Sequence, residues 1–123
     1  VKSKIDSWQF KPMQYAAVEA LSAKKEWYDN MNRVYRSRRD LAGQIMRTLG
    51  CEYDENQVGM FLWGRIPDSA ESGEAIANKV LYEANVFLTP GFIFGSRGER
   101  YIRISLCCNN ETLEEALKRI ENL

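Results

Sequence analysis

Residues 90–105 read PGFIFGSRGERYIRIS and carry the strongest indication of the fold. Proline and glycine punctuate the first half, and Pro90-Gly91 suits the centre of a type II turn, where the second residue has a positive φ. The second half alternates isoleucine with tyrosine, arginine and serine. Over residues 101–106 this alternation predicts a strand with its isoleucines in the core and Arg103 on the opposite face.

Arg103 is the residue of this segment best suited to bind a ligand. A guanidinium held in mid-strand can bind a carboxylate through two parallel hydrogen bonds. The alternative is an exposed arginine in a surface ion pair, which is the commoner situation. The glycines of the segment do not form a phosphate loop, because GxGxxG is missing and a strand rather than a helix follows.

Helical and strand-like periods alternate along the rest of the chain. We expect helices from about residue 12 to 21, from 25 to 49, from 72 to 85 and from 112 to 123, and strands at 58–63, 86–88 and 101–106. This order indicates an α+β fold, a small, mostly antiparallel sheet covered by helices, as a single domain over residues 1–123.

Several residues are expected to begin or end these helices. Gly50 stands where a glycine would stop the second helix, and Asn85 where the third would end. Ser72 is a candidate N-cap of the third helix. The sequence Thr112-x-x-Glu115 matches a capping box for the last one.

The overall charge argues against nucleic acid and membrane surfaces as partners. The chain has 17 Lys and Arg against 17 Asp and Glu, so its formal net charge is zero. The arginines between residues 33 and 39 would spread around a helix and form a solvated face. The apolar stretch 84–96 is too short to span a membrane, and Pro90 and Gly91 interrupt it.

The chain lacks histidine, which excludes Ser-His-Asp and Cys-His catalysis and histidine-ligated metals within it. The acidic group Glu52, Asp54 and Glu55 is expected to be a turn and not a metal site. We expect no metal to be bound.

The three cysteines do not have the spacing of a disulfide framework or a zinc site. Cys51, Cys107 and Cys108 are therefore expected to be small buried residues near element ends, in a reducing, cytoplasmic protein. The first six residues do not form a signal peptide, and the chain begins with Val1. We expect it to be a piece of a longer protein.

The motif PGxxFGxxGxxYxRxS resembles the C-terminal small domain of fold-type I, pyridoxal-phosphate-dependent aminotransferases. The matching residues are Pro90, Gly91, Phe94, Gly95, Gly98, Tyr101, Arg103 and Ser105. The resemblance extends to KPMQ at 11–14, YRSRRD at 35–40, GMFLW at 59–63 and the closing helix at 111–123. Residues 1–14 are most similar to the branch around LL-diaminopimelate, alanine and aspartate aminotransferases.

The resemblance implies a role for Arg103, which would bind the α-carboxylate of the amino acid or 2-oxo acid substrate. Trp63 would lie near the substrate side chain or, alternatively, pack in the core or against another domain. The cofactor, pyridoxal phosphate, would be bound mainly by a large domain that this chain lacks. Neither Lys2 nor Lys4 matches the family's cofactor-binding lysine, so no catalytic residue is expected here and the fragment would be inactive alone.

The same resemblance suggests further partners and leaves alternatives open. Full-length protein would be a homodimer, and its large domain would cover Phe92 and Phe94, which we expect to be partly exposed in this chain. Other pyridoxal-phosphate enzymes share the domain, including β-lyases, aminocyclopropane-carboxylate-synthase-like enzymes and transcription regulators. The alternative of a different class is a free-standing α+β module that binds small carboxylates.

Overall fold

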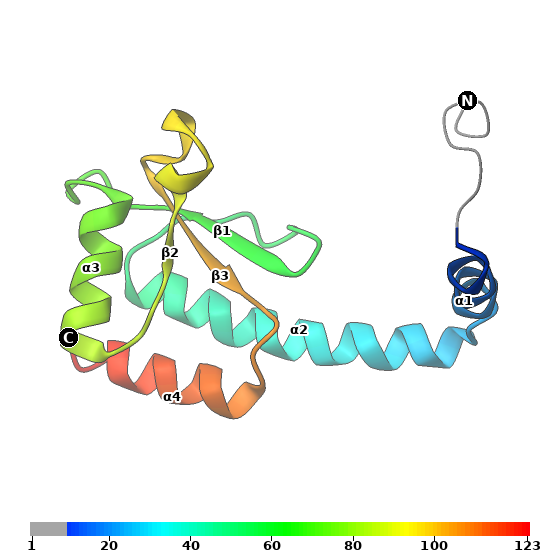
Figure 1. Cartoon of the computed structure of the whole chain (residues 1–123). Helices are drawn as coiled ribbons and strands as arrows, with labels where there is room; N and C mark the ends of the chain where they lie inside the picture. The colour runs from blue at the N-terminus through cyan, green and yellow to red at the C-terminus, as the bar shows by residue number, and fades with distance from the viewer. Residues whose placement is uncertain (1–9) are drawn as a thin grey trace. The chain divides into compact units, whose positions relative to one another are not determined.

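A computed structural model describes residues 10–123 of the chain (Figure 1). The lysines Lys2 and Lys4, and residues 1–9 of the 1–14 segment as a whole, lie outside these residues. The elements are α1 (Lys11–Leu21), α2 (Lys25–Thr48), β1 (Phe61–Arg65), α3 (Gly73–Ala84), β2 (Thr89–Pro90), the 3-10 helices η2 (Gly91–Phe94) and η3 (Ser96–Gly98), β3 (Tyr101–Ser105) and α4 (Asn110–Ile120). The chain divides into two compact units, residues 1–33 and 34–123.

In the first unit, the described residues form α1 and the beginning of α2. Pro12 stands in the first turn of α1, as expected. The hydroxyl of Tyr28 donates to the carbonyl of Ala20 over 2.8 Å. No residue of α1 is buried, and Leu21 is 84% exposed, so within this unit the apolar stripe of the helix is uncovered.

The second unit is built on an antiparallel sheet with the strand order β1-β3-β2. Strand β3 is central, and its Ile104 lies opposite Leu62 of β1. The predicted α+β class, with a small antiparallel sheet and covering helices, is confirmed. Among the described residues, no helix is long and apolar enough to cross a membrane.

One face of the sheet forms the core of the second unit. Leu62, Ile102 and Ile104 are at most 5% exposed. They belong to one apolar cluster with residues from three helices, among them Ala42, Ile45 and Met46 of α2, Val80 and Ala84 of α3, and Leu113, Leu117 and Ile120 of α4. The alternate residues of β1 and β3 lie on the other face and are only half-buried or exposed. This second face carries Arg103 and Trp63.

Three of the expected helix ends are confirmed. The hydroxyl of Ser72 accepts a hydrogen bond from the backbone N–H of Ala75 over 3.0 Å and caps α3. Asn85 ends α3 in the left-handed conformation, with a φ of 55°. Gly50 follows α2 with a φ of 69°.

The predicted capping box is wrong, because α4 begins earlier than Thr112. The side chain of Asn109 accepts from the N–H of Thr112 over 2.9 Å, so Asn109 is the N-cap and Thr112 lies inside the first turn. Glu115 does not reach back to the cap and instead accepts a hydrogen bond from Arg119 over 2.8 Å. Asparagine is at least as good an N-cap as threonine, which explains the choice.

Two predicted strands differ in their bounds. Residues 86–88 form no strand, and β2 is the following pair, Thr89–Pro90. Residue Leu88 is buried, so the segment has the burial of a strand without a paired neighbour. Strand β1 begins at Phe61 rather than at Val58. Before it, Gly59 has a positive φ of 93°, which is not a strand conformation, and the side chain of Gln57 accepts from the N–H of Trp63 and donates to its carbonyl.

The predicted type II turn at Pro90-Gly91 is also wrong. Pro90 ends β2 and Gly91 begins η2, while the positive φ of this loop, 119°, is at Gly95. Glycine is needed at position 91 for a different reason. A Cβ there would lie 2.8 Å from the carbonyl oxygen of Tyr101 and closer still to that of Gly98. The requirement is therefore close backbone approach.

Candidate functional site

Arg103 lies at the centre of the sheet. Its backbone is in register with Trp63 of β1 on one side and with Thr89 of β2 on the other. Because Ile102 and Ile104 are buried against the helices, the side chain of Arg103 is on the open face, as the alternation predicted. A strand paired on both sides fixes the Cα position of this arginine.

Two aromatic rings hold the guanidinium of Arg103. Its central carbon lies 4.2 Å from the ring centre of Phe61 and 4.3 Å from that of Phe94. Phe61 belongs to β1, and Phe94 ends η2. We call these two residues the aromatic clamp. Cation–π attraction to both rings favours the charged group in this place and restricts its rotation.

The guanidinium has no acidic partner among the residues that the structure describes. Among residues 10–123, no carboxylate pairs with Arg103, whereas Arg65 and Arg119 pair with Asp68 and Glu115. The Nε of Arg103 is buried and has no hydrogen-bond partner there. Arg103 thus makes no surface ion pair with the described residues. The two terminal nitrogens of Arg103 donate to none of the described residues, and a carboxylate matches the geometry of two such donors.

Trp63 supports the clamp from the side. Its ring meets that of Phe94 edge to face, with centres 5.3 Å apart, and that of Tyr101 at 6.4 Å. The two hydrogen bonds of Gln57 fix its backbone. Trp63 is half-buried and stands on the same face as Arg103.

The loop that carries Phe94 is anchored by backbone contacts. The N–H of Gly95 donates to the carbonyl of Phe92 over 2.9 Å, and the N–H of Gly98 to that of Gly95 over 2.9 Å. Just after the loop, the guanidinium of Arg100 donates to the carbonyls of Ala70 and Pro67 over 2.6 and 2.8 Å. Sequence reasoning missed the parts played by Phe61 and Arg100. The alternation of β1 placed Phe61 on the face of Trp63 and could have indicated it.

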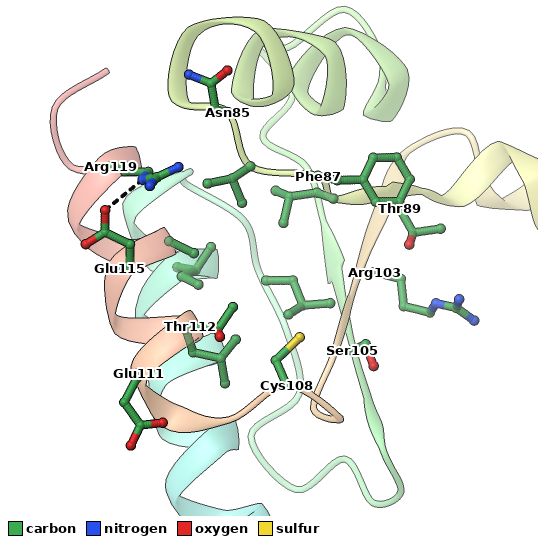
Figure 2. A pocket seen from close by; sticks show the side chains of 16 residues that line it. Asn85, Phe87, Thr89, Arg103, Ser105, Cys108, Glu111, Thr112, Glu115 and Arg119 are labelled. Carbon is green, nitrogen blue, oxygen red and sulfur yellow. Dashed lines mark hydrogen bonds and ion pairs between the residues drawn. The ribbon is translucent and has the colours of Figure 1, made fainter.

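A groove of about 680 Å³ runs beside the sheet, between α4 and the segment from Asn85 to Thr89 (Figure 2). Figure 2 shows the charged group of Arg103 directed away from α4, so only the stem of this residue lines the groove. Across the groove, the hydrogen bond and charge of Arg119 lower the pKa of the exposed Glu115 carboxyl. The Glu115 carboxylate in the groove is therefore neutralised by Arg119.

The described residues do not form a cofactor or metal site. Among residues 10–123, no group of three histidine, cysteine or acidic side chains is close enough to hold a metal ion. Within the described part of the chain, no lysine takes part in the contacts around Arg103. The chemistry that the open face offers is the binding and orientation of a small anion with an apolar neighbour.

The structure also gives the surroundings of Arg38 and the exposure of Phe92 and Phe94. Arg38 donates to the carbonyl of Leu106 over 3.0 Å and lies over the ring of Tyr35, so it has a carbonyl as its partner. Phe92 and Phe94 are 43% and 51% exposed, which confirms their expected partial exposure.

The cysteines only partly follow the prediction. Cys51 is buried, and burial raises the pKa of its thiol to about 11. Cys107 and Cys108 are exposed, so their predicted burial is wrong. They lie in the turn between β3 and α4, beyond the last core residue of the strand.

Comparisons with known proteins identify the family. Residues 4–120 match the family model of aminotransferases of class I and II. The LL-diaminopimelate aminotransferase of Halothermothrix orenii is 36% identical over 122 residues, which cover 99% of this chain and 31% of that protein. The chain thus spans about a third of the length of the curated relatives that it matches.

Solved structures agree with the sequence comparison. A probable N-succinyldiaminopimelate aminotransferase from Thermus thermophilus superposes with a TM-score of 0.80 at 32% identity, over 98% of this chain and 32% of that one. An aromatic aminotransferase from Pyrococcus horikoshii gives a TM-score of 0.75 at 33% identity, over 89% of this chain and 30% of that one. The chain belongs to the class I and II aminotransferase family.

Proposed function

We propose that this chain is the C-terminal small domain of a pyridoxal-phosphate-dependent aminotransferase and that Arg103 binds the α-carboxylate of its substrates. The observation that carries the proposal is the guanidinium of Arg103, which lacks an acidic partner among the described residues and lies between two aromatic rings. Membership of the family and a length of about a third of its relatives support it.

The geometry suits the recognition that transamination requires. An amino acid and a 2-oxo acid both carry an α-carboxylate, so one arginine serves both half-reactions. Two parallel hydrogen bonds from a planar guanidinium fix the plane of the carboxylate and thereby the direction of the bonds at the substrate Cα. The aromatic clamp keeps the guanidinium in one orientation before the substrate arrives, which lowers the entropy cost of binding.

The cofactor belongs to the remainder of the protein in this proposal. Pyridoxal phosphate supplies the electron sink for chemistry at the substrate Cα when it is bound. The residues around Arg103 fit a carboxylate and include no lysine that could hold the cofactor. They bind and orient the substrate, and the fragment alone would be inactive.

The open face of the sheet would be covered in the full-length protein. Phe61 and Phe94 at Arg103, together with Phe92 and Ile93 in the neighbouring loop, are between 36% and 55% exposed. Apolar side chains grouped in this way mark a contact surface. We propose that the large domain of the same protein covers them and that Trp63 lies beside the substrate side chain. The full-length protein would be a cytoplasmic homodimer.

The test is an absorption spectrum of the full-length protein with pyridoxal phosphate. We expect a visible cofactor band that bleaches when an L-amino acid is added and returns with a 2-oxo acid. LL-diaminopimelate is the first amino acid to try, because several relatives carry that name.

Two other results would contradict the proposal. A cofactor band that does not return with any 2-oxo acid would indicate another reaction, such as β-elimination. No cofactor band at all would favour a free-standing carboxylate-binding module. A spectrum of the 123-residue chain under the same conditions is the control, and we expect no band from it.

A further inference from the structure

The adjacent cysteines of the β3–α4 turn take no part in the proposed function. Cys107 and Cys108 are exposed and free, unlike the buried Cys51. Cys108 is one of the residues that line the groove beside the sheet, where Figure 2 labels it. Two neighbouring exposed thiols are a potential chelating group, because thiolates are the protein ligands that soft metals and metalloids prefer.

The turn that carries the two thiols is held at both ends. Before the turn, the N–H of Leu106 donates to the carbonyl of Met60 over 2.9 Å. The carbonyl of Leu106 accepts a hydrogen bond from the guanidinium of Arg38. After it, Asn109 caps α4, and the amide of Asn110 donates to the hydroxyl of Ser37 over 2.8 Å. The backbone that carries the two thiols is therefore fixed on both sides, which lowers the entropy cost of binding a ligand there.

The number of ligands limits what can bind. Among residues 10–123, no third cysteine, histidine or acidic side chain joins the pair in a metal-binding group. Zinc in a structural site requires four ligands, so the pair alone does not complete one. A direct disulfide is also unfavourable, because side chains of adjacent residues diverge whereas a disulfide holds its Cβ atoms about 3.5–4.5 Å apart. An atom bound to both sulfurs makes the bridge longer and relieves this limit on the distance between the Cβ atoms.

We propose that Cys107 and Cys108 form a two-thiolate site for a thiophilic centre with two exchangeable positions, of which a trivalent organic arsenical is the representative. A hydrated arsenical, R–As(OH)₂, reacts with the two thiols to give R–As(S–Cys)₂ and two waters. Two As–O bonds break, two As–S bonds form, and each thiol proton leaves with a hydroxide as water. Arsenic stays trivalent, and no oxidant or reductant is needed.

Phenylarsine oxide is the probe, and the full-length protein is the sample. We expect one arsenical to be retained through gel filtration in excess 2-mercaptoethanol, a monothiol, and released by dithiothreitol, a dithiol. Trypsin cleaves after Arg103 and after Lys118 and so releases residues 104–118 as one peptide. In this peptide, the bound arsenical should protect both thiols from alkylation.

Single substitutions separate chelation from binding to one thiol. We expect Cys107→Ser and Cys108→Ser each to weaken retention by about a hundredfold or more, because the second bond is intramolecular in the wild type. Cys51→Ala is the matched control and should leave retention unchanged. Retention that survives in both serine variants, or equal alkylation of both thiols with and without the arsenical, would overturn the proposal. Neither result depends on the cofactor spectrum.

Discussion

At the scale of single residues, the environment of Arg103 explains what the sequence could and could not predict. Period-2 alternation placed its side chain opposite Ile102 and Ile104, because strand geometry alone determines the face. The aromatic clamp was not predicted. Which ring meets the guanidinium depends on the register of β1 against β3 and on the path of the loop that carries Phe94, and neither follows from local periodicity.

We predict that Phe94→Leu weakens carboxylate binding and leaves the fold stable. Leucine keeps an apolar side chain at this half-exposed position but removes a ring 4.3 Å from the guanidinium. A cation–π contact contributes about 0.5–2 kcal/mol, so substrate affinity should fall several-fold. The KM for the amino acid in the full-length enzyme measures this effect.

The matched control for this substitution is Phe92→Leu. Phe92 lies in the same 3-10 helix but lines a hollow beside the start of α3. Its substitution should leave the KM unchanged. Equal effects of the two substitutions would mean that the loop as a whole, rather than the ring of Phe94, supports binding.

At the scale of elements, local chemistry predicted most helix ends and failed where two signals competed. Ser72 was predicted because its hydroxyl can satisfy a backbone N–H three residues away, and Asn85 because asparagine tolerates the left-handed conformation that ends a helix. At α4, Thr112 was predicted as the cap, whereas the structure has Asn109, which also carries a side-chain acceptor. Residues 86–88 have the burial pattern of a strand, but pairing depends on where β3 runs, which is not a local property.

Substitution of the two competing caps tests the start of α4. Asn109→Ala removes the acceptor of the Thr112 N–H and should lower the free energy of unfolding by about 1 kcal/mol. Thr112→Ala should change it by less than about 0.5 kcal/mol, because the side chain is exposed within the first turn. Denaturant titration of the 123-residue chain measures both, and the reverse order would place the cap at Thr112.

The loop that positions Phe94 makes a second prediction at this scale. In Gly91→Ala, the new methyl group would collide with the backbone carbonyls of Gly98 and Tyr101, which cannot rotate away. We expect a loss of about 1–3 kcal/mol in unfolding free energy. Ser96→Ala, in the same exposed loop, is the control and should be neutral. Near-UV circular dichroism should show the altered aromatic environment, and an unchanged signal would contradict the account.

At the scale of the whole molecule, the core belongs entirely to the second unit. Every buried residue of the apolar cluster lies between Ala42 and Ile120, and α1 buries none. We predict that a chain of residues 34–123 unfolds cooperatively, with a free energy within about 1 kcal/mol of that of the 123-residue chain. Leu62→Ala in the shortened chain is the positive control and should cost about 2–5 kcal/mol. Loss of the cooperative transition on shortening would contradict the prediction.

The family assignment concerns the chain, whereas the proposed activity concerns the longer protein of which we take it to be a part. The chain covers about a third of its curated relatives. The residues described here supply the substrate end of the proposed reaction. The proposed function therefore requires that Arg103 recognises a carboxylate when the protein is complete.

The most direct measurement is the affinity of full-length wild-type protein and Arg103→Gln for an amino acid and for the amine that lacks its α-carboxylate. A charged, two-point hydrogen bond contributes about 2–3 kcal/mol. The account predicts that Arg103→Gln binds the amino acid about a hundredfold more weakly, while the affinity for the amine is unchanged. Equal affinity of the two proteins for the amino acid, or an equal loss for both ligands, would contradict it.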